Sequence, residues 1–303
     1  MIEGPNLARM PATLRDAARL LTRLFSEAGI DTPALDARLL MAAALGVDQA
    51  ELLRCSDQAL GSAARRQIAT MATRRLAREP VSRIIGQRWF HGLQFEIGPA
   101  TLDPRPETET LVEGVLSRIE QDQGLAGAKL RILDLGTGSG AILIALLASL
   151  LAATGIGTDI DPAALQIARR NARRHGVGDR AEFQLSDWLD GVEGRFDLIV
   201  SNPPYIETAM LAELEAEVGR FDPRAALDGG SDGLAAYRQI IAQAEPHLVG
   251  GGLLALEVGA GQARRVVRLC DDAGYLSADL AGQFWPDLAG HERCVAVRAR
   301  GRA

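Results

Sequence analysis

One short segment of the chain, Asn202-Pro203-Pro204-Tyr205, combines groups that could hold a planar NH2. It follows the apolar run 196–201, which predicts a buried strand. Neither proline can donate a backbone hydrogen bond, and both stiffen the backbone, so the segment offers carbonyl acceptors. Asn202 adds a side-chain acceptor and Tyr205 adds a flat apolar face, which suit the protons and plane of an amide or amine. The alternative is a plain turn, in which the same residue types are common.

A glycine-rich segment follows an earlier predicted strand and precedes a predicted helix. It comprises Gly136, Thr137, Gly138, Ser139 and Gly140, and the acidic residue Asp134 lies just ahead of it. Glycines at such a place let the backbone turn tightly and approach a nucleotide or nucleoside closely. The spacing is G-x-G-x-G, not the G-x-G-x-x-G of many dinucleotide-binding proteins. This glycine loop predicts a nucleoside-binding site.

Two aspartates follow the next predicted strand, and their positions predict different tasks. Asp159 lies at the strand end, where a carboxylate can accept hydrogen bonds from both hydroxyls of a ribose. The alternative role is to cap the helix that begins at Pro162, and Asp161 fits that role better. We therefore expect Asp159 to bind ribose and Asp161 to cap the helix.

A third pair of residues, Asp187 and Trp188, follows the predicted strand 181–185. An acid at this place can accept a hydrogen bond from the exocyclic amine of an adenine, and the adjacent indole can cover its ring. The alternative for Trp188 is a half-buried side chain in a surface turn.

The sites above come together if the second part of the chain is a parallel sheet. Strands and helices alternate from residue 130 onward, which is typical of a parallel sheet with helices on both faces. The predicted strands are 130–135, 155–160, 181–185, 196–201 and 253–258, and two weaker strands near 278–282 and 293–299 form a terminal antiparallel hairpin. Ligands of such sheets bind outside the carboxyl ends of the strands, so the four motifs are expected to share one crevice.

The first 80 residues differ in their hydrophobic pattern: apolar residues recur at helical spacing, and no segment predicts a strand convincingly. Thr13 resembles the cap of a first helix, and Thr32-Pro33 and Gly46 resemble the start and end of a second. A third helix is expected over about 62–78. We predict three parts: a helical substrate-recognition domain over 1–80, a β-hairpin linker over 81–105, and the α/β domain over 106–303.

Composition narrows the class of protein. The chain has 303 residues and a net charge of −6, so strong nonspecific binding to nucleic acid is not expected. Its cysteines and histidines lack metal-ligand spacing, which predicts no metal and fits a reducing cytoplasm. The apolar stretch 141–153 is too short to cross a bilayer and predicts a buried helix, and no signal-peptide pattern opens the chain.

Taken together, the glycine loop and the Asn-Pro-Pro-Tyr segment resemble the S-adenosylmethionine-dependent methyltransferases with a seven-stranded Rossmann-like fold. Further motifs are similar to those of the peptide chain release factor glutamine methyltransferases. These motifs are 104–109 (Pro-Arg-Pro-Glu-Thr-Glu), 222–224 (Asp-Pro-Arg), 226–230 (Ala-Leu-Asp-Gly-Gly) and 256–259 (Leu-Glu-Val-Gly). The order of a helical domain, a hairpin and a catalytic domain is also that family's layout. Asp103 departs from the family pattern, in which an apolar residue precedes Pro104.

The resemblance implies methylation of the glutamine side-chain nitrogen (N5) in the Gly-Gly-Gln motif of release factors, with S-adenosylmethionine as cofactor and S-adenosylhomocysteine as product. An amide nitrogen is a poor nucleophile, so the site must orient it. The Asn202 side chain and the Pro203 carbonyl would each accept one amide proton, Tyr205 would stack on the amide plane, and Pro204 would keep the segment rigid. The residues expected at the cofactor are Gly136, Thr137, Gly138, Ser139, Gly140, Asp159, Asp187, Trp188 and Asn202.

Three other functions use the same motifs. A ribosomal-protein glutamine methyltransferase shares the segment and its chemistry, although the layout of residues 1–105 favours the release-factor enzyme. An adenine-N6 methyltransferase of nucleic acid would present a similar amine, but the net acidity and the lack of a basic insert oppose it. A protein that only binds the cofactor would leave the intact Asn-Pro-Pro-Tyr segment unexplained.

Overall fold

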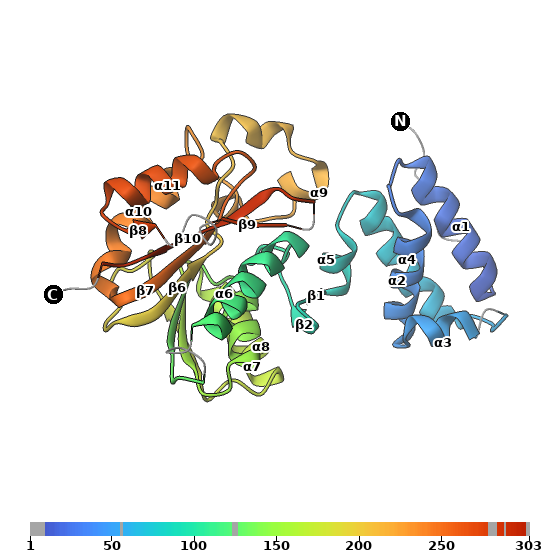
Figure 1. Cartoon of the computed structure of the whole chain (residues 1–303). Helices are drawn as coiled ribbons and strands as arrows, with labels where there is room; N and C mark the ends of the chain where they lie inside the picture. Colours follow the sequence, from blue (N-terminus) through green and yellow to red (C-terminus); the bar gives the residue numbers. More distant parts are fainter. Residues whose placement is uncertain (1–9, 55–56, 123–126, 278–283, 288, 301–303) are drawn as a thin grey trace. The chain divides into compact units, whose positions relative to one another are not determined.

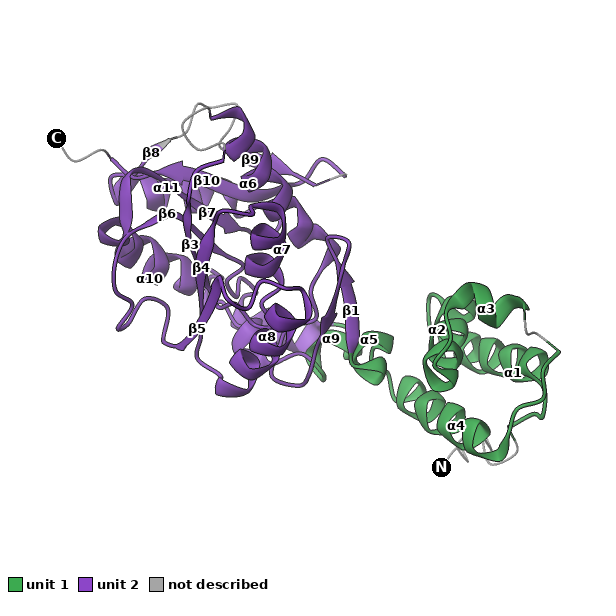
Figure 2. Cartoon of the chain, turned by 90° about the horizontal axis from the view of Figure 1, so that it is seen from below, with its two compact units in different colours: residues 1–86, 215–221 green, residues 87–214, 222–303 purple. Residues whose placement is uncertain are grey.

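The computed structural model describes residues 10–54, 57–122, 127–277, 284–287 and 289–300, and Figure 1 labels most of its helices and strands. The chain divides into two compact units (Figure 2). Unit 1 comprises residues 1–86 and 215–221, and unit 2 comprises residues 87–214 and 222–303. Unit 1 therefore contains a short segment that lies, in sequence, within unit 2.

Unit 1 is helical, as its apolar spacing predicts. Its helices are α1 (Leu14–Glu27), α2 (Pro33–Leu45), α3 (Gln49–Arg54), α4 (Ser62–Leu76), α5 (Val81–Ile85) and α9 (Ala216–Gly219). The expected caps are confirmed: the Thr13 hydroxyl accepts a hydrogen bond from the Asp16 N–H at 3.2 Å, and Gly46 ends α2 in the left-handed conformation at φ 69°. The short helix α3 was not predicted, because six residues carry too little periodicity to recognise.

A buried ion pair lies inside unit 1. Nε of Arg75 is 2.7 Å from Oδ2 of Asp36, and both side chains are less than 10% exposed. The other end of the same guanidinium lies 3.2 Å from Glu217, in the segment 215–221. Arg78 lies 2.8 Å from the same carboxylate, so these charges tie the segment to the helices of unit 1.

The expected hairpin exists, but it is shorter than predicted. Its strands are β1 (Gln87–Phe90) and β2 (Leu93–Glu96), which pair antiparallel. The prediction of strand structure from residue 81 was wrong, because Val81–Ile85 forms α5. Its three apolar residues recur at helical spacing, and Gly86 ends the helix at φ 78°.

Unit 2 is built on a mostly parallel sheet, as the alternation predicts. Its strands are β3 (Arg131–Leu135), β4 (Thr154–Asp159), β5 (Ala181–Leu185), β6 (Phe196–Ser201), β7 (Leu248–Glu257), β8 (Leu276–Ser277), β9 (Phe284–Pro286) and β10 (Glu292–Arg298). Their order is β5-β4-β3-β6-β7-β10-β8, with β9 also paired to β10. The strands β3 to β7 are parallel neighbours, and β10 is antiparallel to β7. The fold is thus the expected Rossmann-like α/β sheet.

The C-terminal part of the sheet differs in detail from the expectation. Residues 284–286 were predicted to connect two strands, but they form β9, whose partner β10 lies close to the expected strand 293–299. The other expected strand, 278–282, lies outside the described residues.

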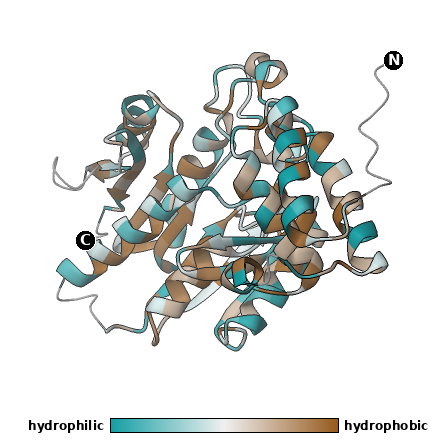
Figure 3. Cartoon of the chain, turned by 90° about the vertical axis from the view of Figure 1, so that its right-hand side faces the viewer, coloured by the Kyte–Doolittle hydropathy of each residue, from teal (hydrophilic) through white to brown (hydrophobic). Residues whose placement is uncertain are grey.

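Helices cover both faces of the sheet. They are α6 (Glu109–Gln121), α7 (Ala141–Ser149), α8 (Pro162–Arg174), α10 (Ala235–Ala244) and α11 (Ala263–Asp272), joined by the 3-10 turns η2 (Pro106–Thr108), η3 (Thr208–Glu213), η4 (Arg224–Ala226) and η5 (Glu245–His247). Successive residues of β3 enter opposite cores: Ile132 packs with α6, α7 and α8, and Leu133 packs with α10 and α11. Figure 3 shows the resulting apolar strands and two-sided helices. Of the described helices, none has the length and hydrophobicity needed to span a membrane.

Candidate active site

A cavity of about 580 Å³ lies at the carboxyl ends of the parallel strands. All of its lining residues belong to unit 2. Nine predicted site residues line it: Gly136, Thr137, Gly138, Ser139, Asp159, Asp187, Trp188, Asn202 and Pro204. Three others, Gly140, Pro203 and Tyr205, are not in its wall. The structure thus brings the four motifs to one crevice, as the fold predicts for a ligand site of an open α/β sheet.

The glycine loop has the conformation that its glycines allow. Gly136, Gly138 and Gly140 have φ angles of 69°, 55° and 82°, which most other residues rarely adopt. The Thr137 N–H donates to the Thr158 carbonyl at 2.8 Å and anchors the loop to β4. Gly140 has a packing role, because a Cβ there would lie 2.8 Å from Ile144 at the start of α7.

Asp134, in β3, holds the glycine loop and the start of α7 by hydrogen bonds. Its Oδ2 accepts hydrogen bonds from the Thr137 hydroxyl at 2.7 Å and from the Leu143 N–H at 3.3 Å. Its Oδ1 is buried and has no hydrogen-bond partner among the described residues. Burial raises the pKa of Asp134 to about 7, against the lowering effect of these two hydrogen bonds.

Asp159, at the end of β4, and Asp161, just after it, have different roles. Asp161 caps α8, because its Oδ1 accepts from the Ala163 N–H at 2.7 Å, which confirms the prediction. Asp159 lines the cavity and accepts from the Gly138 N–H at 2.9 Å. Burial raises the pKa of Asp159, against the backbone hydrogen bonds that favour its charged form. Its role in holding ribose remains a prediction.

Trp188 is half-buried and forms part of the cavity wall. Its backbone has φ 52°, and its indole N–H donates to Oε1 of Gln239 at 2.7 Å. This hydrogen bond fixes the ring, so the indole offers a positioned apolar surface to a ligand. The neighbouring Asp187 is exposed at the same wall, where its carboxylate can accept from an amine.

Asn202 begins the Asn-Pro-Pro-Tyr segment directly after β6. Its Nδ2 donates to the hydroxyl of Thr108 at 3.1 Å. No described residue donates to its Oδ1, so this oxygen is available to a ligand in the cavity that Asn202 lines. Pro204 also lines the cavity, and Pro203 is buried beside it.

Tyr205 is fixed by the structure behind the cavity. Its carbonyl accepts from Nε2 of Gln262 at 2.9 Å, and its ring packs beside Gly259, where a Cβ would lie 2.9 Å from the ring. Burial raises the pKa of Tyr205 to about 12, so the phenol is neutral near pH 7. Stacking of this ring on a substrate remains a prediction.

The motif at 226–230 packs directly against the Asn-Pro-Pro-Tyr segment. A Cβ on Gly229 would lie 2.8 Å from the Tyr205 Cα and 2.9 Å from the Pro204 carbonyl oxygen, so only glycine fits. The Gly229 N–H donates to the Ile206 carbonyl at 2.8 Å. Nearby, Arg105 forms an ion pair with Asp222 at 2.6 Å, which joins two of the motifs.

The cavity fits the expected S-adenosylmethionine. Its volume is within the usual range for small-molecule sites, and its walls combine a glycine loop, four aspartates and an indole. Nothing comparable exists for a metal: within the described residues, no group of three His, Cys, Asp or Glu side chains is placed to hold one.

Sequence reasoning missed several residues that hold the site. Thr108 was considered only as part of the motif 104–109, and Gln239 and Gln262 were given no role. The motif that contains Thr108 is one that the resemblance picks out, which was the available signal. The two glutamines carry no local pattern, since their partners lie 51 and 57 residues away.

Both units match known families. Residues 16–86 match the family model described as the PrmC N-terminal domain, and residues 126–249 match the model described as a methyltransferase domain. The chain is 46% identical to the release factor glutamine methyltransferase of Rhodospirillum rubrum over 96% of this chain and 88% of the relative. It is 45% identical to the protein of that name from Bradyrhizobium diazoefficiens, over 94% of this chain and 95% of the relative.

Solved structures share the fold. The crystal structure of the hMettl16 catalytic domain in complex with a 3′UTR hairpin has a TM-score of 0.51 and 16% identity, covering 76% of this chain and 81% of that chain. At this identity the likeness concerns the fold alone.

Proposed function

Because this chain belongs to the release factor glutamine methyltransferases, we propose that it methylates the side-chain amide nitrogen (N5) of the glutamine in the Gly-Gly-Gln motif of peptide chain release factors. The cofactor is S-adenosylmethionine. When bound, it supplies an electrophilic methyl group and leaves as S-adenosylhomocysteine. The glycine loop, Asp159, Asp187 and Trp188 would hold it in the cavity that they line.

The observation that carries this proposal is the state of the Asn202 side chain. Its Nδ2 is engaged by Thr108, and its Oδ1 has no donor among the described groups at the cavity. The Pro203 carbonyl would provide a second acceptor, and because residue 204 is also a proline, no backbone N–H at that position competes with the substrate NH2 for this oxygen. Two acceptors match the two protons of a glutamine NH2.

These residues would orient the substrate amide and stabilise the charge that develops on its nitrogen. Held by two acceptors, the amide nitrogen cannot turn its protons toward the methyl group, so its lone pair is directed there. The same oxygens stabilise the positive charge that grows on nitrogen during transfer. The nitrogen then loses one proton to water, which completes the reaction without a protein base. Tyr205 is neutral, which suits an apolar contact with the amide plane.

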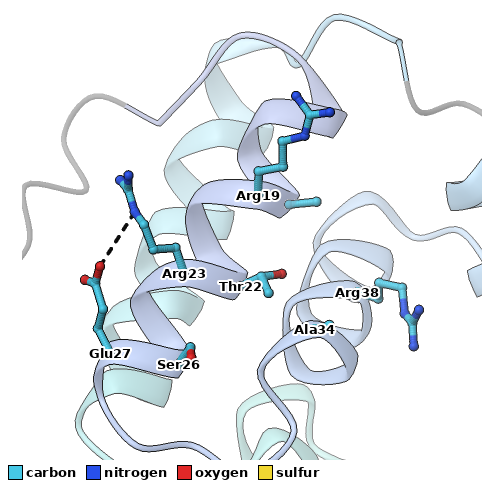
Figure 4. A pocket seen from close by; sticks show the side chains of 8 residues that line it. Arg19, Thr22, Arg23, Ser26, Glu27, Ala34 and Arg38 are labelled. Atoms are coloured by element: carbon cyan, nitrogen blue, oxygen red, sulfur yellow. Dashed lines mark ion pairs between the residues drawn. The ribbon is translucent and has the colours of Figure 1, made fainter.

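We also propose that unit 1 recognises the protein substrate. The groove between α1 and α2 supports this role (Figure 4). It has a volume of about 550 Å³ and is lined by Arg19, Arg23 and Arg38 together with Glu27 and small side chains. Figure 4 shows Arg23 directed toward Glu27, at 3.9 Å, while Arg19 and Arg38 extend from separate helices. An acidic surface of a release factor would complement them.

Nucleic acid and membranes are not proposed as partners, and the cytoplasmic location expected from the cysteines stays a prediction.

The test of the function is a methyl-transfer assay with labelled S-adenosylmethionine and three acceptors: a release factor, a ribosomal protein and an adenine-containing oligonucleotide. Label should appear on the release factor, and mass spectrometry should place it on the Gly-Gly-Gln glutamine. Label on either other acceptor instead would overturn the proposal.

A further inference from the structure

Asn171 is a buried polar residue of α8 that joins two separate segments of unit 2. Its side chain is 0% exposed. Its Oδ1 accepts a hydrogen bond from the Glu96 N–H at 2.8 Å, and its Nδ2 donates to the Glu96 carbonyl at 2.9 Å. The same Nδ2 donates to the Ser139 carbonyl, also at 2.9 Å. One side chain thus connects the end of β2 to the glycine loop.

The three hydrogen bonds fix the orientation of the Asn171 amide. Its NH2 has two protons, and each meets one main-chain carbonyl. A flipped amide would place an oxygen against both carbonyls and an NH2 against the Glu96 N–H, so all three hydrogen bonds would be lost. Because buried backbone groups without partners are costly, the side chain has one stable arrangement.

The first of the two segments is the glycine loop. Ser139 lines the cavity, and its carbonyl belongs to the peptide unit that continues to Gly140. The N–H of that peptide donates to the Thr137 carbonyl at 2.8 Å. Because a peptide unit is planar, holding the Ser139 carbonyl also fixes the direction of this N–H. The loop packs on α8 as well, since a Cβ on Gly140 would lie 3.2 Å from the Cβ of Ala168.

The second segment follows Glu96 and forms another part of the cavity wall. We call residues 97–104 the strap. The structure describes it throughout, and it contains no helix or strand, so its position depends on how its ends are held. Three of its apolar residues line the cavity: Ala100, Leu102 and Pro104.

The hairpin holds both ends of the strap. Ahead of the strap, Asn171 binds both backbone polar groups of Glu96. At the other end, Nε of Arg88 in β1 donates to the Pro104 carbonyl at 3.1 Å. The position of the hairpin on α8 therefore decides where the strap lies.

Other polar contacts between the hairpin and α8 lie nearer the surface. Arg170 forms an ion pair with Glu96 at 2.6 Å, but the two side chains are 49% and 39% exposed, and exposed ion pairs contribute little. Nε2 of the half-buried His175 lies 3.0 Å from the Gln94 carbonyl. The hydrogen bonds of Asn171 are buried and sheltered from water, so they are the stronger polar link.

We propose that Asn171 is a positioning residue for the cofactor, because it fixes the glycine loop relative to the strap and so holds two parts of the cavity wall in place for S-adenosylmethionine. This inference rests on the cofactor site of the proposed function. Asn171 is not one of the residues that line the cavity, so it acts through Ser139 and the strap. With the wall fixed in advance, less ordering is needed when the cofactor binds, and the affinity is higher.

The first test is isothermal titration calorimetry with S-adenosylmethionine. Asn171→Asp keeps an acceptor for the Glu96 N–H but places an oxygen against the two carbonyls. It should raise the cofactor dissociation constant by about 10- to 100-fold. Asn171→Ala should raise it by about 10-fold. Alanine favours the helix and lets water reach the freed backbone groups, so this variant keeps the test decisive if Asn171→Asp fails to fold.

Tyr275→Phe is the matched control. It removes another buried hydrogen bond to a main-chain carbonyl, from the Tyr275 hydroxyl to Ile241 at 3.1 Å, in the core that contains α10 and α11. Thermal unfolding compares the losses of stability. The control should unfold at a lower temperature and bind the cofactor with a dissociation constant within about twofold of the parent. An equal rise of the dissociation constant in the control would show that affinity follows overall stability and would overturn the inference.

Hydrogen exchange of the cofactor-free protein gives a readout that does not depend on binding. Asn171→Asp should speed amide exchange in segments 96–103 and 136–141 and leave β6 and β7 as protected as in the parent. Tyr275→Phe should leave exchange in the two segments unchanged. Parental exchange in both segments of a folded Asn171→Asp or Asn171→Ala protein would overturn the inference.

Kinetics and a second binding variant separate this inference from the proposed function. In the Asn171 variants, KM for S-adenosylmethionine should rise while kcat at saturating cofactor changes less than about threefold. A lower kcat with parental KM and dissociation constant would overturn the positioning role. Parental affinity in Asp159→Ala would refute the cofactor site and the inference with it. Weak binding by Asp159→Ala with parental binding by folded Asn171 variants would refute only the inference.

Discussion

The Asp159 carboxylate holds the glycine loop, because its Oδ2 accepts a hydrogen bond from the Gly138 N–H at 2.9 Å. Its Oδ1 accepts from the Asp161 N–H, also at 2.9 Å. One side chain thus joins the end of β4 to the loop that follows β3, and both lie in the cavity wall. A carboxylate oxygen has more than one lone pair, so these bonds leave Asp159 able to accept from a ribose as well.

Asp159→Ala should weaken S-adenosylmethionine binding by about 10²- to 10⁴-fold. The change removes acceptors for the ribose, each worth about 1.5–3 kcal/mol when charged, and it releases the Gly138 N–H. Isothermal titration calorimetry measures the effect. Asp161→Ala is the control: loss of the α8 cap should cost about 1 kcal/mol of stability with a smaller change in affinity. Equal affinity in Asp159→Ala and the parent would contradict the ribose role.

Asn202→Ala should lower kcat by about 10²- to 10³-fold while cofactor affinity changes little. The reason is that the lost acceptor interacts with the reacting amide, as an oxyanion-hole donor does with its oxyanion. Single-turnover methyl transfer at saturating cofactor measures the step. Asn202→Asp, which keeps an acceptor but adds a charge, should retain partial activity. A folded Asn202→Ala enzyme with the parental rate would mean that the segment is structural.

Asp134→Asn should flatten the pH dependence of stability in the cofactor-free protein. Burial raises the Asp134 pKa from 3.8 to about 7, so the folded state binds this proton more tightly than the unfolded state. The resulting stabilisation is complete below about pH 4 and is lost as pH rises to about 7, a difference of about 4 kcal/mol. Denaturant unfolding at pH 5 and pH 8 measures it. The parent should lose more free energy of unfolding between these values than the variant, and parallel losses would contradict the assignment.

Charge reversal of the groove in unit 1, as Arg19→Glu with Arg38→Glu, should raise KM for release factor about 10-fold or more and leave cofactor affinity unchanged. Both side chains are exposed at the groove, and the cavity in unit 2 has no lining residue from unit 1 among those described. Steady-state kinetics with a release factor checks this. Arg66→Glu is the control, because it changes an exposed charge on α4 of the same unit. An unchanged KM in the double variant would remove the groove from substrate recognition.

Many helices, strands and caps of this protein could be predicted from short stretches of its sequence. The strands at 181–185 and 196–201 were predicted to the residue, and the Asp161 cap was recognised, because apolar runs, prolines and caps act over a few positions. The same patterns predict one shared crevice, since parallel strands end at a common edge of the sheet. The residues that meet there are the glycine loop, Asp159, Trp188 and Asn202.

Other features depend on contacts between distant segments. The glycine-rich start of β7, at 249–252, carries no strand pattern and becomes a strand only through its neighbours β6 and β10. Thr108 lies 94 residues from Asn202, and nothing in either local sequence shows that they meet. The sequence by itself thus supplied the acceptors and their order along the chain. Only the tertiary structure decided which way Asn202 faces, because its Nδ2 donates to the Thr108 hydroxyl, which the folded chain brings to it.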